Sequence, residues 1–159
     1  MSGRLQSEIK QTKPFANLEE EVLLNLQRTA DAAMRPVEAA IKSHGLSSTQ
    51  YNVLRILRGA GEGGRTCGEI GDRLITRDPD ITRLLDRMEK RGLIRRERQT
   101  TDRRVILTFV TEMGLDILAQ LDSQVPETIK SVLGHMSERK LRDLCRLLEQ
   151  ARQKEPVEE

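Results

Sequence analysis

The sequence predicts a mainly helical protein that carries one small β-hairpin. Three observations support this prediction. Apolar residues recur at helical spacing over most of the 159 residues, the period changes to that of strands between residues 93 and 110, and only 2% of the residues are aromatic. The shortage of aromatic residues argues against a β-sandwich, because strands favour aromatic and β-branched side chains.

The composition limits both the core and the location of the protein. Charged residues make up 33% of the chain and apolar residues 36%, so we expect a thin, extended shape whose apolar surface is covered better in a dimer. No apolar run is long enough to cross a membrane, and residues 1–10 lack the apolar stretch of a signal peptide. We expect a cytoplasmic protein without membrane contact, in which Cys67 and Cys145 are reduced thiols.

The N-terminal part is predicted to form a flexible arm over residues 1–16 and a long helix over residues 17–44. Asn17 suits the N-cap of this helix, three glutamates follow in its first turn, and an apolar stripe runs along one face. Pro36 removes an internal hydrogen bond, so we expect it to kink or break the helix about one turn earlier.

A compact lobe is predicted over residues 45–110. Ser47 or Ser48 is expected to cap its first helix, whose inner face holds Tyr51. Four glycines then form a loop, and a short helix follows over residues 67–74. A tight turn separates this short helix from the next one.

The second helix of the pair is predicted over residues 79–91. Asp78 is the expected cap, and Pro79 suits the first helical position. The helix has one apolar face with spacing i, i+3, i+4, i+7, formed by Ile81, Leu84, Leu85 and Met88. Its opposite face is polar, and Gly92 is expected to end it.

The segment 93–110 is predicted to be a β-hairpin with a basic tip, because two strand-like runs flank the polar turn 99–103. Two further helices are expected over residues 111–153. Thr111 should cap the first of them and Gly134 should end it. We also expect a kink at Pro126, a last helix that opens at Ser137, and a frayed tail over residues 154–159.

Positive charge is concentrated in one segment of a chain whose net charge is only +2. Residues 83–104 contain nine Lys or Arg and four Asp or Glu. A basic segment in a nearly neutral protein is typical of nucleic-acid binding. A solvated charged face remains the alternative if the charge is considered alone.

The order of the predicted elements is more specific than the charge. A short helix, a tight turn, a helix with a polar face and a basic hairpin together make a winged helix-turn-helix. An α-helix fits the major groove, where base edges can be distinguished, and the preceding helix braces it across the backbone. An arginine at the hairpin tip can enter the adjacent minor groove, whose negative potential attracts it. The pattern therefore predicts DNA binding.

Three sequence segments resemble the signature of the multiple-antibiotic-resistance regulator (MarR) family. They are Asp-Pro-Asp-Ile-Thr-Arg-Leu-Leu-Asp-Arg-Met-Glu-Lys-Arg-Gly-Leu-Ile-Arg-Arg (78–96), Asp-Arg-Arg (102–104) and Thr-Glu-Met-Gly (111–114). Residues 45–57 are also similar to the second helix of that family. The resemblance covers about residues 17–153, and in the outer helices it is only architectural.

The resemblance implies a fold and a partner. The winged helix-turn-helix lobe is expected to be flanked by N-terminal (17–44) and C-terminal (111–153) dimerisation helices that intertwine in a homodimer. Two lobes would read a palindromic operator on double-stranded DNA. Most members of the family are repressors that release DNA when a small aromatic or phenolic molecule, an oxidant or a metal binds, so a small, possibly aromatic effector is expected here.

The resemblance also assigns residues to the DNA surface. On the recognition helix these are Asp80, Thr82, Arg83 and Arg87. Arg83 could pair with guanine, and Asp80 could accept a hydrogen bond from a cytosine amino group; Asp80 could equally serve only to stabilise the helix N-terminus.

On the wing, the expected DNA-binding residues are Asp102, Arg103 and Arg104. Arg104 would enter the minor groove and Asp102 would orient it, unless the hairpin tip is only a solvated turn. Ser47, Ser48 and Thr49 could hold a phosphate at the start of their helix, and plain capping is the alternative for each.

The expected effector pocket lies near Tyr51 and His44, although Tyr51 could simply be core. Cys67 starts the short helix, where its pKa could fall, but the first long helix lacks the cysteine of the family's oxidant sensors. Cys145 lies between apolar positions and is expected in the core. We expect no metal site, no cofactor and no enzymatic activity, because no catalytic motif is present. The alternative function is a winged-helix protein-interaction module without a DNA site.

Overall fold

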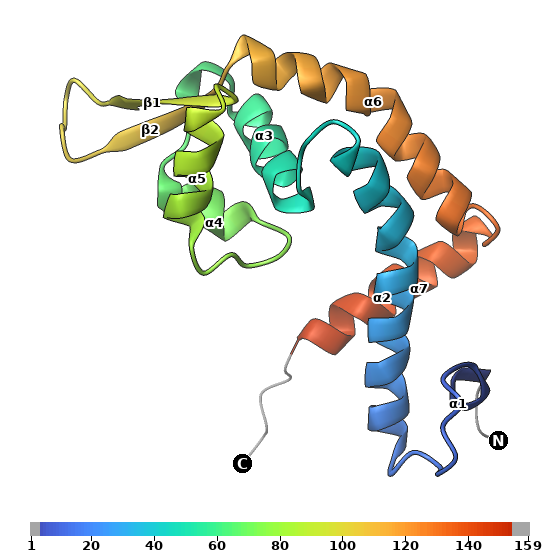
Figure 1. The fold of residues 1–159 in the computed structure, drawn as a ribbon. Coiled ribbons are helices and arrows are strands. Elements are labelled where there is room, and N and C mark those ends of the chain that lie inside the picture. The colour runs from blue at the N-terminus through green and yellow to red at the C-terminus, as the bar shows by residue number, and fades with distance from the viewer. Residues whose placement is uncertain (1–3, 154–159) are drawn as a thin grey trace, which may run out of the picture.

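The computed structural model describes residues 4–153 and consists mainly of helices (Figure 1). In chain order the elements are α1 (Arg4–Glu8), α2 (Leu18–Lys42), α3 (Ser48–Ala60), the 3-10 turn η1 (Gly61–Gly63), α4 (Cys67–Arg73), α5 (Ile81–Lys90), β1 (Ile94–Arg98), β2 (Ile106–Val110), α6 (Glu112–Leu133) and α7 (Glu138–Arg152). The mainly helical fold with one hairpin is thus confirmed. The tail expected to be frayed lies outside the described residues.

The N-terminal part differs from the prediction in two places. Residues 4–8 form helix α1 instead of an arm without regular structure, because Leu5 finds a buried position on its short apolar face. Helix α2 runs unbroken through Pro36, whereas a kink or break was expected. The buried residues Val37 and Ile41 follow the proline and keep this part of α2 packed in the core. Asn17 caps α2 as predicted, and its side chain accepts from the amide of Glu20 at 2.8 Å.

The core of the molecule lies in the lobe formed by α3, α4, α5 and the hairpin. Helix α3 is central, since it packs against α2, α4, α6 and β2. The fully buried side chains of the lobe include Leu54, Leu57, Ile70, Leu85, Met88 and Leu93. Helix α6 completes the core with Leu118 and Leu121. The apolar face predicted for the recognition helix is confirmed at Leu84, Leu85 and Met88, while Ile81 is half-buried.

The wing is an antiparallel pair in which Ile94 faces Val110 and Arg98 faces Ile106. A third piece of extended chain joins it, because Arg65 exchanges two backbone hydrogen bonds with Thr108 at 2.8 and 3.0 Å. Thr108 is buried. The strands therefore start from the packed lobe, and the outer part of the hairpin projects into solvent (Figure 1).

The segment Thr-Glu-Met-Gly at the start of α6 joins the wing to the long helix. The Thr111 hydroxyl donates to the Gly92 carbonyl at 2.6 Å and accepts from the Gly114 amide at 3.2 Å. A Cβ atom on Gly114 would lie 2.5 Å from the Leu93 carbonyl oxygen. Only glycine allows this close approach, which explains why the segment ends in that residue. Helix α6 continues through Pro126 and bends along its length (Figure 1), and Gly134 follows its end as predicted.

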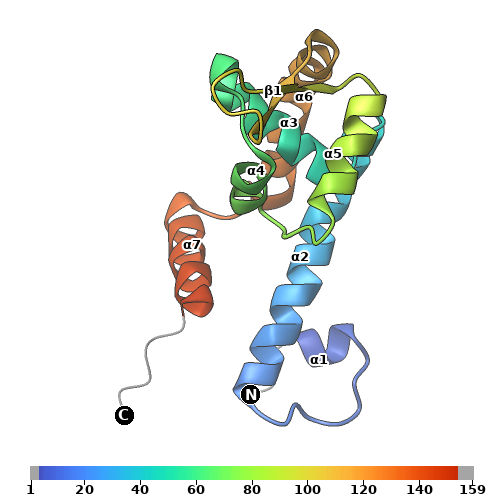
Figure 2. The ribbon, with the colours of Figure 1, turned by 90° about the vertical axis from the view of Figure 1, so that its left-hand side faces the viewer.

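Helix α7 stands apart from the lobe in both ribbon views (Figures 1 and 2). Ser137 caps it as predicted. All residues of α7 are described, and none of them is buried in the single chain. Cys145 is exposed, so the expectation of a core position is wrong for the single chain. The reason is that the helix carries an apolar stripe but has no core of its own chain to pack into.

Candidate nucleic-acid interface

Helix α5 directs its polar face outward because its apolar face is anchored in the core. Thr82, Arg83 and Arg87 all lie on the exposed side. The helix starts at Ile81, two residues after the predicted start, and Asp80 rather than Asp78 occupies the N-cap position. The Asp78 carboxylate instead accepts from the Asp80 amide at 2.9 Å, which turns the chain just before the helix.

Asp80 and Arg83 form a pair at the start of the recognition helix. The Asp80 side chain caps no backbone amide, and its Oδ2 lies 3.4 Å from Nε of Arg83. The Arg83 side chain is 81% exposed, so its guanidinium is available for a partner outside the protein. The pair brings one acceptor and one arginine donor fork together at the start of the helix.

A second aspartate–arginine pair lies at the wing tip. Asp102 Oδ1 accepts from the Arg104 amide at 3.0 Å and lies 3.6 Å from Arg104 Nε. The Arg104 side chain is 94% exposed. The tip is a real turn, since the Val105 amide donates to the Asp102 carbonyl at 3.0 Å and Arg98 donates to the Arg103 carbonyl. Arg103 is also exposed.

The N-terminus of α3 borders the recognition helix. Ser47 and Gln50 form a reciprocal capping box, with hydrogen bonds of 3.2 and 3.0 Å. The Ser47 hydroxyl is therefore used in capping, and Ser48 and Thr49 are half-buried beside it. Arg91 donates to the Gly45 carbonyl at 2.8 Å and to Gln50 at 3.3 Å, and so ties the end of α5 to this corner. These hydrogen bonds of Arg91 were not expected from the sequence.

The brace helix α4 has its own capping box. Thr66 and Glu69 exchange hydrogen bonds, with the Glu69 carboxylate accepting from the Thr66 amide at 2.8 Å. This backbone hydrogen bond, followed by the one from the Thr66 hydroxyl, lowers the pKa of the half-buried Glu69. Cys67 follows the cap, is half-buried and lies 3.9 Å from the Thr82 hydroxyl.

A network around Arg96 links the wing to the recognition helix. Arg96 Nη2 donates to Asp86 and to Glu89, each at 2.6 Å, and Nε donates to Glu89 at 2.9 Å. The hydrogen bonds with Glu89 raise the pKa of Arg96 above its ordinary value. The sequence analysis counted Arg96 only as one charge of a basic segment. The spacing of Asp86 and Glu89 on one helix face was the signal that could have indicated a partner.

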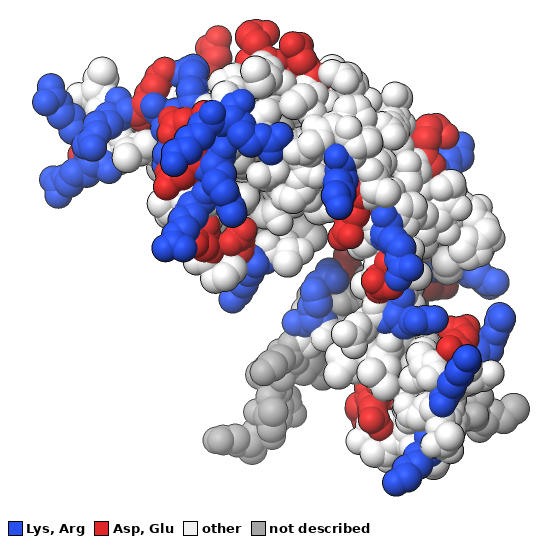
Figure 3. Space-filling view, in the orientation of Figure 1, with Lys and Arg blue, Asp and Glu red and all other residues white. Residues whose placement is uncertain are grey.

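The basic residues of α5 and the wing share one side of the lobe. Figure 3 shows Lys and Arg side chains gathered over these two elements. The hairpin extends beyond the body of the lobe, so its tip is separated from α5 (Figure 1). The two aspartate–arginine pairs thus belong to two projecting parts of one basic face. An arrangement of this kind can contact two neighbouring grooves of a duplex.

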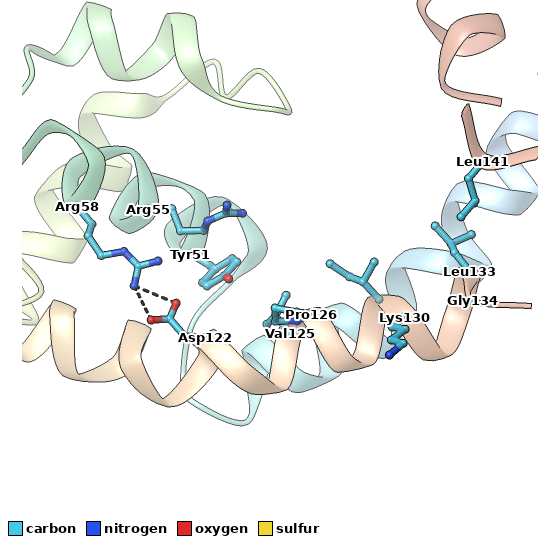
Figure 4. A pocket seen from close by; sticks show the side chains of 11 residues that line it. Tyr51, Arg55, Arg58, Asp122, Val125, Pro126, Lys130, Leu133, Gly134 and Leu141 are labelled. Carbon is cyan, nitrogen blue, oxygen red and sulfur yellow. Dashed lines mark hydrogen bonds and ion pairs between the residues drawn. The ribbon is translucent and has the colours of Figure 1, made fainter. Parts of the chain in front are cut away.

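Two hollows lie beneath the lobe on either side of Tyr51. The larger one measures about 500 Å³ and lies between α3, α6 and the start of α7 (Figure 4). The smaller one measures about 220 Å³ and is closed by α2 and the turn at Ile75. Tyr51 and Arg55 line both hollows, and the Arg55 guanidinium lies 5.7 Å from the centre of the Tyr51 ring.

His44, which was expected beside the pocket, lines neither of these two hollows. Its Nδ1 lies 3.2 Å from the Ala40 carbonyl and 3.1 Å from the Ser43 hydroxyl. Residues that the sequence analysis did not single out line the larger hollow, among them Arg58, Asp122 and Lys130. Arg58 Nη1 donates to both carboxylate oxygens of Asp122, at 2.8 and 2.9 Å, and so pairs α3 with α6 (Figure 4).

Within residues 4–153 no group of three or more His, Cys, Asp or Glu side chains is arranged to hold a metal ion. In the same part of the chain no helix combines the length and the apolar character that crossing a membrane requires.

Known proteins are similar to this chain over the lobe and beyond it. The model of the MarR family matches residues 44–105. The HTH-type transcriptional regulator MhqR of Bacillus subtilis is 30% identical over 105 residues, which cover 66% of this chain and 70% of that protein. The homoprotocatechuate degradative operon repressor of Escherichia coli is 25% identical over 133 residues, which cover 84% and 88% of the two chains.

A solved structure supports the same assignment. The crystal structure of a MarR transcription factor from Planctomyces limnophilus is 39% identical, with a TM-score of 0.65, and the match covers 86% of this chain and 98% of that one. The similarity extends over the lobe, the wing and the outer helices. The chain therefore belongs to the MarR family of winged-helix transcriptional regulators.

Proposed function

We propose that this regulator binds a palindromic operator as a homodimer, represses transcription there and releases the DNA when a small anionic aromatic molecule binds. One observation supports the DNA contact above all others. Arg83 and Arg104 are the exposed arginines of two aspartate–arginine pairs, and they belong to separate projecting parts of one basic face.

The recognition helix reads bases in the major groove. Arg83 gives two parallel hydrogen bonds to guanine, and Asp80 holds the guanidinium in place or accepts from a neighbouring cytosine amino group. The 3.4 Å separation of Asp80 and Arg83 is compatible with either role. Thr82 and Arg87, on the same exposed side, contact further base edges or the phosphates beside them.

The wing adds a minor-groove contact. Arg104 enters the groove, where narrow A·T-rich segments attract arginine most strongly. Asp102 restrains this side chain, since it bonds the Arg104 amide and lies near Nε. Arg103 contacts a phosphate.

At the other edge of the recognition helix, the start of α3 holds a phosphate through Ser48, Thr49 and backbone amides, because the Ser47 hydroxyl already caps the helix.

A second copy of the chain covers the apolar residues of the arms. Leu18 and Leu23 on α2 and Leu147 on α7 are exposed in the single chain. A water-exposed apolar stripe of this kind is typical of a protein–protein interface. Two lobes related by a two-fold axis require two half-sites with the same symmetry, so the operator is palindromic.

The effector binds in the hollows beside Tyr51. Their walls combine apolar side chains such as Val125 and Ile129 with the cationic group of Arg55. A flat ring can stack on Tyr51 or Arg55 while a carboxylate pairs with a cation. The Escherichia coli relative is named as a repressor of an operon that degrades homoprotocatechuate, a phenolic acid; this supports both the repressor role and the effector class.

The experiment that tests DNA binding is the selection of genomic fragments by the purified protein, followed by titration of the selected duplex at several salt concentrations. We expect one enriched palindromic site whose affinity falls steeply as salt rises, because phosphate contacts release counterions. Homoprotocatechuate, added as a probe, should weaken this complex. Recovery of no common sequence, with equal and weak affinity for all duplexes, would instead favour a protein-interaction module.

A further inference from the structure

The chain passes from the recognition helix to the wing through a very short connection. Helix α5 ends at Lys90, Gly92 takes a positive φ of 73°, and β1 starts at Ile94. Backbone hydrogen bonds from the amides of Gly92 and Leu93 close the turn at 2.8 and 3.0 Å. A turn with a glycine at its centre fixes where the wing begins, but by itself it resists rotation of the hairpin only weakly.

Arg96 adds the side-chain link between the two parts. Of the residues that the structure describes, only Arg96 on the strands makes a side-chain hydrogen bond or ion pair with α5. Its guanidinium bridges Asp86 and Glu89, and its backbone amide also donates to Glu89 at 3.1 Å. Two contacts on one helix face and a third from the strand backbone restrain both the distance and the angle between α5 and β1.

The surroundings of Arg96 favour a persistent link. Its side chain is only 25% exposed, whereas most of the chain's ion pairs lie in open solvent, where such pairs contribute little. A guanidinium is planar and offers a rigid fork of donors, so it can serve two carboxylates at once. The bridge also offsets one of the two negative charges of Asp86 and Glu89, on a helix that faces a polyanion in the function proposed above.

We propose that Arg96 is a positioning residue that holds the wing at a fixed angle to the recognition helix. It sets the separation at which Arg83 and Arg104 reach their two grooves, and it does not itself contact the DNA. The proposal rests on the proposed function, since it presumes that both elements bind one duplex. With the link in place, the wing is already oriented before it meets DNA, and the complex loses less conformational freedom on binding.

Removal of the link should reduce the contribution of the wing specifically. Without the link, the hairpin is held only at its base, where Ile94 and Thr108 are buried and Arg65 pairs with Thr108. Its outer part must then be ordered when Arg104 enters the minor groove, so the net gain from that contact falls. The contact of Arg83 should be unaffected, because α5 remains anchored in the core by Leu84, Leu85 and Met88. A general loss of stability would weaken both contacts alike.

A double-mutant cycle on the selected operator tests the proposal. In the parent protein we expect R104A to lower the operator affinity. In an R96M background the same change should have an effect at least about threefold smaller, because a coupling of that size exceeds the scatter found between independent sites. R83A should have the same effect in both backgrounds. R58M is the matched control: it removes an arginine that bridges two elements elsewhere, so its effect and that of R104A should multiply.

The possible outcomes separate the two proposals. If R104A has no effect in the parent, the wing is not on the DNA, and the proposed function and the role of Arg96 are both rejected. If R104A lowers affinity by the same factor in the parent and in R96M, DNA binding stands and the positioning role is wrong. If R96M does not fold, as judged by circular dichroism, E89A weakens the link from the helix side, and its cycle with R104A must show the same reduced effect.

Discussion

The lobe and the arms of this molecule place their apolar residues in opposite ways. Most of the largest fully buried side chains belong to α3, α4, α5 and the wing, with Ile41, Leu118 and Leu121 added from the helices beside them. The start of α2 and α7 instead leave theirs exposed or half-buried. The lobe is therefore folded by its own chain, whereas the arms are not covered by it. In the proposed homodimer, this difference would let one chain keep a rigid DNA-reading surface on arms whose arrangement depends on a second copy.

Charges introduced into the apolar stripe of α7 should have the largest effect, because they should prevent the proposed dimer from forming. We expect L144D combined with L148D to convert the dimer to monomers, with a dissociation constant raised at least about 100-fold, because each buried leucine contributes about 1.5–3 kcal/mol. Sedimentation of the parent and the variant at micromolar concentration measures this. R142A combined with R146A, on exposed positions of the same helix, is the control and should remain dimeric. A parent that sediments as a monomer would contradict the dimer.

The lobe should respond to a much smaller chemical change. G114A adds one methyl group that would lie 2.5 Å from the Leu93 carbonyl oxygen, so we expect a loss of about 1–3 kcal/mol in the free energy of unfolding, as for other overpacked positions. G71A on α4 meets nothing within 4 Å and should increase stability by about 0.5–1 kcal/mol, because alanine favours a helix. Urea unfolding of both variants measures the two signs. Equal effects of the two variants would show that the join between wing and α6 is not tight.

The smallest expected effect concerns the pH dependence of the brace helix. Because the pKa of Glu69 is lowered in the folded protein from an ordinary value of 4.5, its contribution is present above that value and is lost as the pH falls through the folded pKa. We expect the melting temperatures of the parent and of E69Q to differ at pH 7 and to converge below about pH 4.5. E62Q, an exposed acid of η1 outside any capping box, is the control. A difference that persists unchanged at low pH would contradict the role of the carboxylate.

The sequence predicted the lobe better than the arms, and the reason is the same difference in packing. Periodicity and capping residues are local signals, so the buried face of α5, the hairpin and the caps at Asn17, Thr111 and Ser137 could be predicted. A break was one of the two outcomes expected at Pro36, and it does not occur, because packing of the following turn maintains a helix that has lost one hydrogen bond.

The features that the sequence did not reveal depend on contacts between distant residues. Arg96 meets Asp86 and Glu89 only because the chain reverses at Gly92, and Arg91 meets Gly45 across the lobe. The burial of Leu5 and the exposure of Cys145 likewise depend on what faces them in space. For the DNA-binding residues, the sequence predicted the aspartates and arginines and the structure adds their pairing; their roles on DNA stay predictions.

The most direct test of the account is a titration of R83A and R104A against the selected operator and a scrambled duplex at several salt concentrations. We predict that R83A lowers operator affinity by about 1–3 kcal/mol and relaxes the preference at one base position in each half-site, with little change for scrambled DNA. R104A should weaken both complexes and flatten the salt dependence, with some loss of preference for A·T-rich flanks, and D102A should show part of this effect. If R83A weakens both duplexes equally and R104A changes neither, the recognition helix and the wing do not contact DNA as proposed.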